Sequence, residues 1–232
     1  NILHVKFELG LFDQADLDVD LAVSLNGNKA SKRIASEITS ESITLLKNDN
    51  ALLPLSKNLK SILVTGKSAH SKRHLCGGWT LSWASADEND LDCLTILDAI
   101  KRTVSKDTKI TYAYDLEELK QLNPTPSQYD VIISVVGEEP HSEWLGDSFD
   151  LQIEEDEFAL LKSAKNTDIP VVMVSMVGRP QKLIWMDQHI PTILQTYYPG
   201  TEGAIPVART IFGDICPSGK TAISFPKDGN QI

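Results

Sequence analysis

Four carboxylates, a histidine and a tryptophan fall within eleven consecutive residues, 137–147. The carboxylates are Glu138, Glu139, Glu143 and Asp147. A carboxylic acid can protonate a glycosidic oxygen when burial or a neighbouring negative charge raises its pKa. The segment follows the most strongly apolar stretch of the chain, so it is a candidate active-site loop. A solvated acidic loop without a catalytic role is the alternative, and composition favours neither.

A second loop, 76–83, carries Trp79 and Trp83 beside the glycine pair Gly77-Gly78. Indole rings bury large apolar areas, and the C–H faces of sugar rings stack well on them. Glycine pairs are common where another stretch of backbone approaches closely. The two tryptophans are therefore candidates for an aromatic wall beside a sugar. The alternative is that both belong to the core.

The glycines, histidines and cysteines of the chain do not have the spacing of known nucleotide-binding or metal-binding motifs. The segment 199–203 opens a helix whose N-terminus could hold an anion. It has neither the dinucleotide-binding nor the P-loop glycine spacing. The histidines show no His-Glu-x-x-His spacing, and 70–74 indicates a loop, so we expect no metal and no cofactor. The chain has three cysteines, Cys76, Cys93 and Cys216, and they form no Cys-x-x-Cys motif. We therefore expect buried or half-buried thiols, with one disulfide as the alternative.

Composition limits the classes of partner. The chain has 232 residues and a formal charge of -10. Such an acidic balance disfavours nucleic acid and anionic membrane surfaces, whereas a neutral substrate fits. No apolar run approaches the roughly 18 residues of a membrane span, and no signal peptide is visible. The chain opens at Asn1 and ends after an apparent strand, so both ends are expected to be cuts within a longer protein.

The elements that must position these loops alternate along the chain. Apolar, β-branched runs predict strands at 61–66, 109–114, 130–137, 171–177, 192–197 and 221–225. Helical spacing predicts helices at 31–47, 94–104, 116–122, 155–165 and 202–212. The alternation predicts an α/β fold with a mostly parallel sheet and helices on both faces, an α/β sandwich with flavodoxin-like layering. Ligands of such sheets bind beyond the carboxyl ends of the strands, where both candidate loops fall.

The loops together resemble glycoside hydrolase family 3, especially its β-glucan exohydrolase branch. The motifs occur in the family's order and cover nearly the whole chain. They are Val5-Lys6-Phe7 with Leu9-Gly10-Leu11-Phe12, Leu45-Leu46-Lys47-Asn48 with Leu52-Leu53-Pro54-Leu55, Cys76-Gly77-Gly78-Trp79-Thr80, Val136-Gly137-Glu138 with Glu143 and Gly146-Asp147, Gly178-Arg179-Pro180, Pro199-Gly200-Thr201-Glu202-Gly203, and Phe212-Gly213-Asp214 with Pro217-Ser218-Gly219-Lys220.

The resemblance implies a β-glucosidase-type enzyme with two domains. In the family an N-terminal TIM-like barrel carries the nucleophilic aspartate. In the exohydrolase branch the acid/base is a glutamate on a loop of the second, α/β domain, and it corresponds to Glu143. A tryptophan that stacks on the leaving group corresponds to Trp83, with Trp79 as supporting wall. Glu138 and Glu139 are the next candidates for the acid/base role.

The resemblance also implies how the chain is organised. Residues 1–28 are expected to be the end of the barrel and the interdomain linker, and 29–232 the α/β domain. The barrel itself is expected to lie outside this chain, so the isolated chain is expected to be inactive and to expose an apolar face. The expected partners are a β-linked glucoside or oligosaccharide and the barrel domain of the same protein. The sequence leaves the compartment open; for the intact protein a secreted or periplasmic location is expected.

Two other functions fit parts of the pattern. A non-catalytic carbohydrate-binding or interface module from the same family would retain Trp79 and Trp83 without needing Glu143. A flavodoxin-like binder of flavin or nucleotide would share the layering, but the acidic charge and the missing phosphate loop oppose it.

Overall fold

The computed structural model describes residues 1–13 and 18–227, apart from the side chain of Leu145. The chain divides into two units, 1–34 and 35–232. The first unit holds α1 (Ile2–Glu8), α2 (Val19–Leu25) and the start of α3 (Lys29–Ser42). Neither α1 nor α2 buries a residue. No helix among the described residues has the length and apolar character needed to cross a bilayer.

The second unit is built on one mixed sheet. Its described strands are β1 (Thr44–Asn48), β2 (Ser61–Thr65), β3 (Lys109–Ala113), β4 (Val131–Gly137), β5 (Val171–Met176) and β6 (Thr192–Gln195). Their order across the sheet is β1-β6-β5-β4-β2-β3. Every neighbouring pair is parallel except β1 with β6. The predicted mostly parallel α/β sheet is therefore confirmed.

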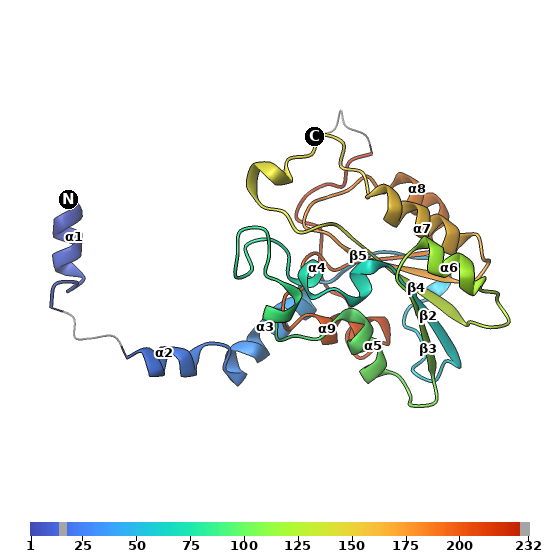
Figure 1. The fold of residues 1–232 in the computed structure, drawn as a ribbon, viewed down its shortest axis with the longest axis horizontal. Helices are drawn as coiled ribbons and strands as arrows, with labels where there is room; N and C mark the ends of the chain where they lie inside the picture. The colour runs from blue at the N-terminus through green and yellow to red at the C-terminus, as the bar shows by residue number, and fades with distance from the viewer. Residues whose placement is uncertain (14–17, 228–232) are drawn as a thin grey trace. The chain divides into compact units, whose positions relative to one another are not determined.

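Helices cover both faces of this sheet (Figure 1). On one face lie α5 (Ile96–Thr103) and α9 (Ala204–Ile211), and on the other α6 (Leu116–Leu122), α7 (Glu155–Lys165) and α8 (Ile184–His189). The short α4 (Lys72–Cys76) follows β2. Single 3₁₀ turns occur at Asp49–Ala51, Lys67–His70, Glu88–Asp90 and Glu143–Gly146.

The alternation of side chains along the strands explains the two layers. Ile62 and Val64 of β2 belong to the core beneath α5 and α9, whereas Leu63 between them belongs to the core beneath α6 and α7. All three are fully buried. Each such side chain contributes about 1.5–3 kcal/mol on burial, so an apolar strand is stable only between two helical layers.

Three predictions of secondary structure were wrong. The predicted helix 31–47 ends at Ser42, and Thr44–Asn48 is a strand paired with β6. The spacing of the apolar residues there fits a helix or a strand. The segment forms a strand because it can pair with the open edge of β6. Residues 221–225 form no strand. His74 lies in α4 and not in a loop.

The strand order places the candidate loops. β2 and β4 are neighbours, while the chain proceeds from β2 to β3 on one side and from β4 to β5 on the other. The crevice at such a switch point, beyond the carboxyl ends of the strands, is where α/β sheets bind ligands. The loops 66–95 and 138–154 leave the sheet at this point, and they carry the tryptophans and the carboxylates.

Candidate functional site

Glu143 lies on the loop after β4, at the start of the 3₁₀ turn Glu143–Gly146. Its side chain is exposed, and its backbone has a φ of 49°. A non-glycine residue in this left-handed region is uncommon, and such positions cluster at functional sites. The indole Nε1 of Trp83 donates to Glu143 Oε2 at 3.3 Å. The structure thus brings together two of the three predicted site residues.

The two candidate loops pack directly on each other. A Cβ at Gly78 would lie 2.2 Å from the His141 carbonyl oxygen, so only glycine fits there. Ser142 Oγ donates to the Trp83 carbonyl oxygen. The predicted close backbone approach at the glycine pair is confirmed, and it sets the tryptophan loop against the segment that leads into Glu143.

The tryptophans differ in their surroundings. Trp83 is half-buried, and its ring centroid lies 5.9 Å from that of Trp144 at an interplanar angle of 44°. Trp79 is 65 % exposed, and its backbone N–H donates to the Trp83 carbonyl oxygen at 3.2 Å. Neither is therefore a core tryptophan. Trp144, which sequence reasoning did not assign to the site, adds a second ring beside Trp83.

Glu138 is a buried carboxylate that holds neighbouring loops together, and it is not an exposed acid. Only 4 % of it is exposed. Its carboxylate accepts from the Gly178 N–H at 2.7 Å, from Arg179 Nε at 2.9 Å and from the Tyr198 hydroxyl at 3.1 Å. Burial, together with this carboxylate, raises the pKa of Tyr198. Because these partners follow β5 and β6, Glu138 joins three loops at the carboxyl edge of the sheet.

Arg179 extends these contacts to the Glu143 turn. Its guanidinium donates to the Gly146 carbonyl oxygen, at the end of that turn. One side chain therefore connects the buried Glu138 carboxylate with the segment that holds Glu143. These long-range contacts were not predicted from the sequence, although the Gly178-Arg179-Pro180 motif marked the position.

A cleft of about 410 Å³ opens beside these loops. Its walls include Ala84 from the tryptophan loop, Glu139 and His141 from the carboxylate loop, and Arg179. Glu143, Trp83 and Trp79 are not among its lining residues. They lie instead on the loops that border it.

A chain of three polar side chains leads from the buried Ser68 to Glu139 at the wall of the cleft. Ser68 Oγ lies 2.7 Å from His74 Nδ1, and His74 Nε2 lies 3.3 Å from Glu139 Oε1. Burial lowers the pKa of His74. The order Ser–His–Glu resembles a hydrolytic triad, but Ser68 is fully buried and presses on Gly137, where a Cβ would lie 2.2 Å from its Oγ. The hydroxyl cannot meet a substrate, so the chain is structural.

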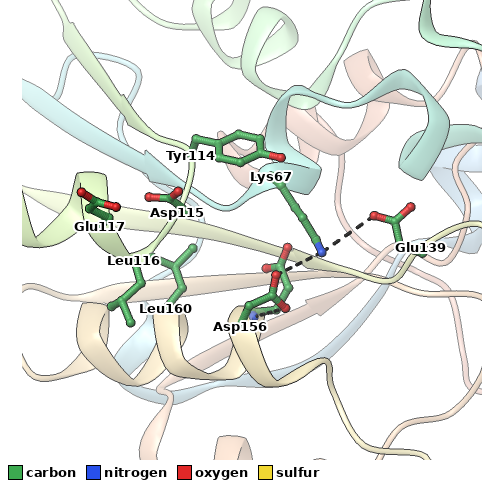
Figure 2. Close-up of a pocket in the computed structure, with 9 residues that line it drawn as sticks. Lys67, Tyr114, Asp115, Leu116, Glu117, Glu139, Asp156 and Leu160 are labelled. Carbon is green, nitrogen blue, oxygen red and sulfur yellow. Dashed lines mark hydrogen bonds and ion pairs between the residues drawn. The ribbon is translucent and has the colours of Figure 1, made fainter.

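A second cavity of about 410 Å³ lies between the starts of α6 and α7 (Figure 2). Lys67 enters it between Glu154, Asp156 and Glu139, with Nζ–oxygen distances of 2.8, 3.2 and 3.8 Å. Burial alone would lower the pKa of Lys67, but the hydrogen bonds to Glu154 and Asp156 raise it above its usual value.

Glu157 also lines this second cavity, and it is 3 % exposed. Neither of its carboxyl oxygens has a hydrogen bond of normal geometry, and the nearby Lys67 and Ser68 only partly offset the effect of burial on its pKa. Burial raises its pKa to about 8. Within residues 1–13 and 18–227, no group of three or more His, Cys, Asp or Glu side chains could hold a metal ion.

Comparison with known proteins places this arrangement in a family. The model of the glycosyl hydrolase family 3 C-terminal domain matches residues 43–232. The chain is 32 % identical to a β-xylosidase of Formosa agariphila and 33 % identical to a lysosomal β-glucosidase of Dictyostelium discoideum, each over 100 % of its length. It covers only 33 % and 30 % of those proteins.

A solved structure agrees with these matches. The β-glucosidase of Listeria innocua in complex with gluconolactone superposes with a TM-score of 0.86 at 26 % identity, over 99 % of this chain and 31 % of that one. The fold, the family match and the identities agree. The chain belongs to glycosyl hydrolase family 3 and corresponds to its C-terminal α/β domain, the domain found in β-glucosidase- and β-xylosidase-type enzymes.

Proposed function

We propose that this domain supplies the acid/base carboxyl group of a retaining β-glucosidase-type glycosidase, and that Glu143 is that group. The observation that carries the proposal is the pairing of Glu143 with the Trp83 indole on an exposed turn beyond the carboxyl end of β4. An acid and an aromatic surface in contact are what protonation of a stacked sugar's leaving oxygen requires. The left-handed backbone at Glu143 supports the same assignment.

The reaction needs a second carboxyl group. A retaining glycosidase holds its nucleophile and its acid/base about 5–5.5 Å apart. We assign the nucleophile to an aspartate of a barrel domain that joins this one in a longer protein. Glu143, protonated, donates its proton to the glycosidic oxygen while the barrel aspartate attacks the anomeric carbon. As a carboxylate, Glu143 then takes a proton from the water that releases the sugar.

The tryptophans would position the substrate. The Trp83 ring, with Trp144 beside it, offers an apolar surface for the leaving-group sugar, while its N–H orients the Glu143 carboxyl group. Trp79, exposed on the same loop, would extend this wall. A β-linked glucoside or oligosaccharide is the proposed substrate. The names of the matched relatives include both β-glucosidase and β-xylosidase, so a xyloside belongs in the first substrate panel.

The first unit supports a barrel partner. Its helices expose large apolar side chains, among them Ile2, Phe7, Val19 and Val23, each at least 64 % exposed. Helices with no buried residue gain little stability unless another surface covers them. We propose that the barrel domain supplies that surface. The chain alone would then lack the nucleophile, and we expect it to hydrolyse little or nothing.

The test compares Glu143→Ala with Glu139→Ala in the longer protein that joins this domain to its barrel. Glu139 is an exposed carboxylate on the same loop, so it is a matched control. We expect Glu143→Ala to lose roughly 10²–10⁴-fold in kcat/KM on an alkyl β-glucoside, whose leaving oxygen needs the proton. Added azide should restore turnover of an activated substrate by trapping the glycosyl intermediate, and Glu139→Ala should stay near wild type.

Two outcomes would reject the proposal. If Glu143→Ala matches wild type while Glu139→Ala loses activity, the acid/base is Glu139. If the longer protein hydrolyses no β-glycoside yet binds oligosaccharides, the domain is a binding module derived from the family.

A further inference from the structure

Two cysteines bracket the loop that carries both tryptophans. Cys76 ends α4, and Cys93 lies two residues before Thr95, the N-cap of α5. Cys76 is buried and Cys93 half-buried, and both are free thiols. They pack in one small apolar cluster with Ala86 and Leu91. Cys93 packs against the cluster that contains Cys76, and each thiol shifts the pKa of the other. Contact between the two sulfur atoms therefore needs no large movement of the backbone.

Polar contacts that do not involve the thiols hold together the two ends of the loop, residues 71–73 and residues 88–91. The Glu88 carboxylate accepts from Ser71 Oγ at 2.6 Å and from the backbone N–H groups of Lys72 and Arg73 at 2.9 and 3.2 Å. Lys72 Nζ donates to the Leu91 carbonyl oxygen at 2.6 Å. These contacts join residues a few positions before Cys76 to residues a few positions before Cys93. The two ends are thus aligned up to the cysteines.

We propose that Cys76 and Cys93 are a disulfide site that closes the tryptophan loop. The co-reactant is a disulfide oxidant, either a low-molecular-weight or a protein disulfide. The Cys93 thiolate attacks one sulfur of the oxidant and releases a first thiol. The Cys76 thiolate then attacks Cys93 in the mixed disulfide and releases a second thiol. The two cysteines lose two protons and two electrons, and the electrons reduce the oxidant.

The surroundings of the two thiols suit these roles. Cys93 is the more exposed, so an oxidant can reach it. The hydrogen bond from Cys76, aided by the charge of Lys72, lowers the pKa of Cys93. The same hydrogen bond and burial raise the pKa of Cys76. Cys93 is therefore the attacking thiol and Cys76 the resolving one.

The disulfide would stiffen the part of the site that contacts Glu143. The closed loop contains Trp79 and Trp83, and Trp79, Leu81 and Ser85 within it have positive φ angles. A loop with several such residues keeps its conformation only when its ends are fixed. Formation of the bond does not depend on the proposed glycosidase function, so the two proposals fail separately.

The test incubates the 232-residue chain with oxidised glutathione, alkylates the remaining thiols and digests with trypsin. Arg73 and Lys101 flank one tryptic peptide, 74–101, that holds both cysteines, whereas Cys216 falls in the separate peptide 210–220. We expect 74–101 to lose two hydrogen atoms and to escape alkylation. The midpoint of thermal unfolding should rise by about 6–12 °C, the value for closing a loop of this length in a chain of this size.

Cys216 provides the internal control, since it is exposed and reports whether the oxidant has acted. If Cys216 is glutathionylated while Cys76 and Cys93 are both alkylated, or if each carries its own glutathione, the proposal is wrong. Cys93→Ser should abolish the oxidation-dependent rise in the unfolding temperature, and Cys216→Ser should leave it unchanged. A rise that survives Cys93→Ser would also overturn the proposal.

Discussion

Glu157→Gln should make the domain more stable at neutral pH, and the gain should depend on pH. Glu157 is buried at the start of α7 with no hydrogen bond of normal geometry, and burial raises its pKa to about 8. An acid whose pKa is raised on folding stabilises the folded state below its unfolded pKa, and that contribution is lost as pH rises through the folded pKa. The loss for Glu157 therefore runs from about pH 4.5 to about pH 8.

The magnitude follows from these two pKa values. At pH 7.5 the unfolded chain has released the proton, while most folded molecules retain it, which corresponds to about 4 kcal/mol of lost stability. At pH 5 the same calculation gives about 1 kcal/mol. Glutamine carries no titrating proton, so the variant should exceed wild type by these amounts.

Urea unfolding of the chain at pH 5 and pH 7.5 measures both gains. Glu155→Gln is the matched control, because Glu155 lies in the same first turn of α7 and is exposed. The control should change stability by less than about 1 kcal/mol at either pH, the range of a surface helix-dipole contact. A Glu157→Gln variant that is less stable than wild type at pH 7.5, or whose gain is equal at both pH values, would refute the reasoning.

Three further substitutions test the contacts that hold the candidate site in place. Arg179→Met removes the guanidinium partner of the buried Glu138 carboxylate, so urea unfolding should show a loss of about 3 kcal/mol; no loss would mean that this pair is not maintained in solution. Gly78→Ala pushes a Cβ into the His141 carbonyl oxygen, so the longer enzyme should lose glycosidase activity, and unchanged activity would contradict the tight contact between the loops. Trp83→Phe keeps an aromatic ring but removes the indole N–H donor, so we expect a larger change in kcat than in KM. A change in KM alone would mean that Trp83 stacks on the sugar but does not orient Glu143.

Much of the fold was accessible from local patterns. The strands at 131–137 and 171–176 are predominantly apolar runs rich in β-branched residues, as is typical of strands buried on both faces. The segment Thr44–Asn48 was misassigned because its spacing fits a helix, and only the free edge of β6 makes it a strand. Cys216, expected to be at least half-buried, is exposed, because nothing local distinguishes a packed thiol from a surface one.

The sequence named candidate site residues, but it did not predict the contacts between them. The family motifs pointed to Glu143 and Trp83, and the structure sets them 3.3 Å apart. The ion pair between Glu138 and Arg179 was not predictable, since it joins residues 41 positions apart that share no periodic pattern. The same holds for the proximity of Cys76 and Cys93. Such contacts depend on the directions in which two loops leave neighbouring strands. Those directions are set by the packing of the whole sheet and not by the local sequence.

The most direct test of the central proposal is how the effect of Glu143→Ala depends on the leaving group. A nitrophenolate leaves without a proton, whereas a sugar or alkyl alcohol needs one from the general acid. In the longer enzyme, the variant should lose about 10²–10⁴-fold in kcat/KM, which reports the step that releases the leaving group, on an alkyl or oligosaccharide β-glucoside, and far less in kcat/KM on a dinitrophenyl β-glucoside. An equal loss of kcat/KM on both substrates, or no loss on either, would show that Glu143 is not the acid/base of this family-3 domain.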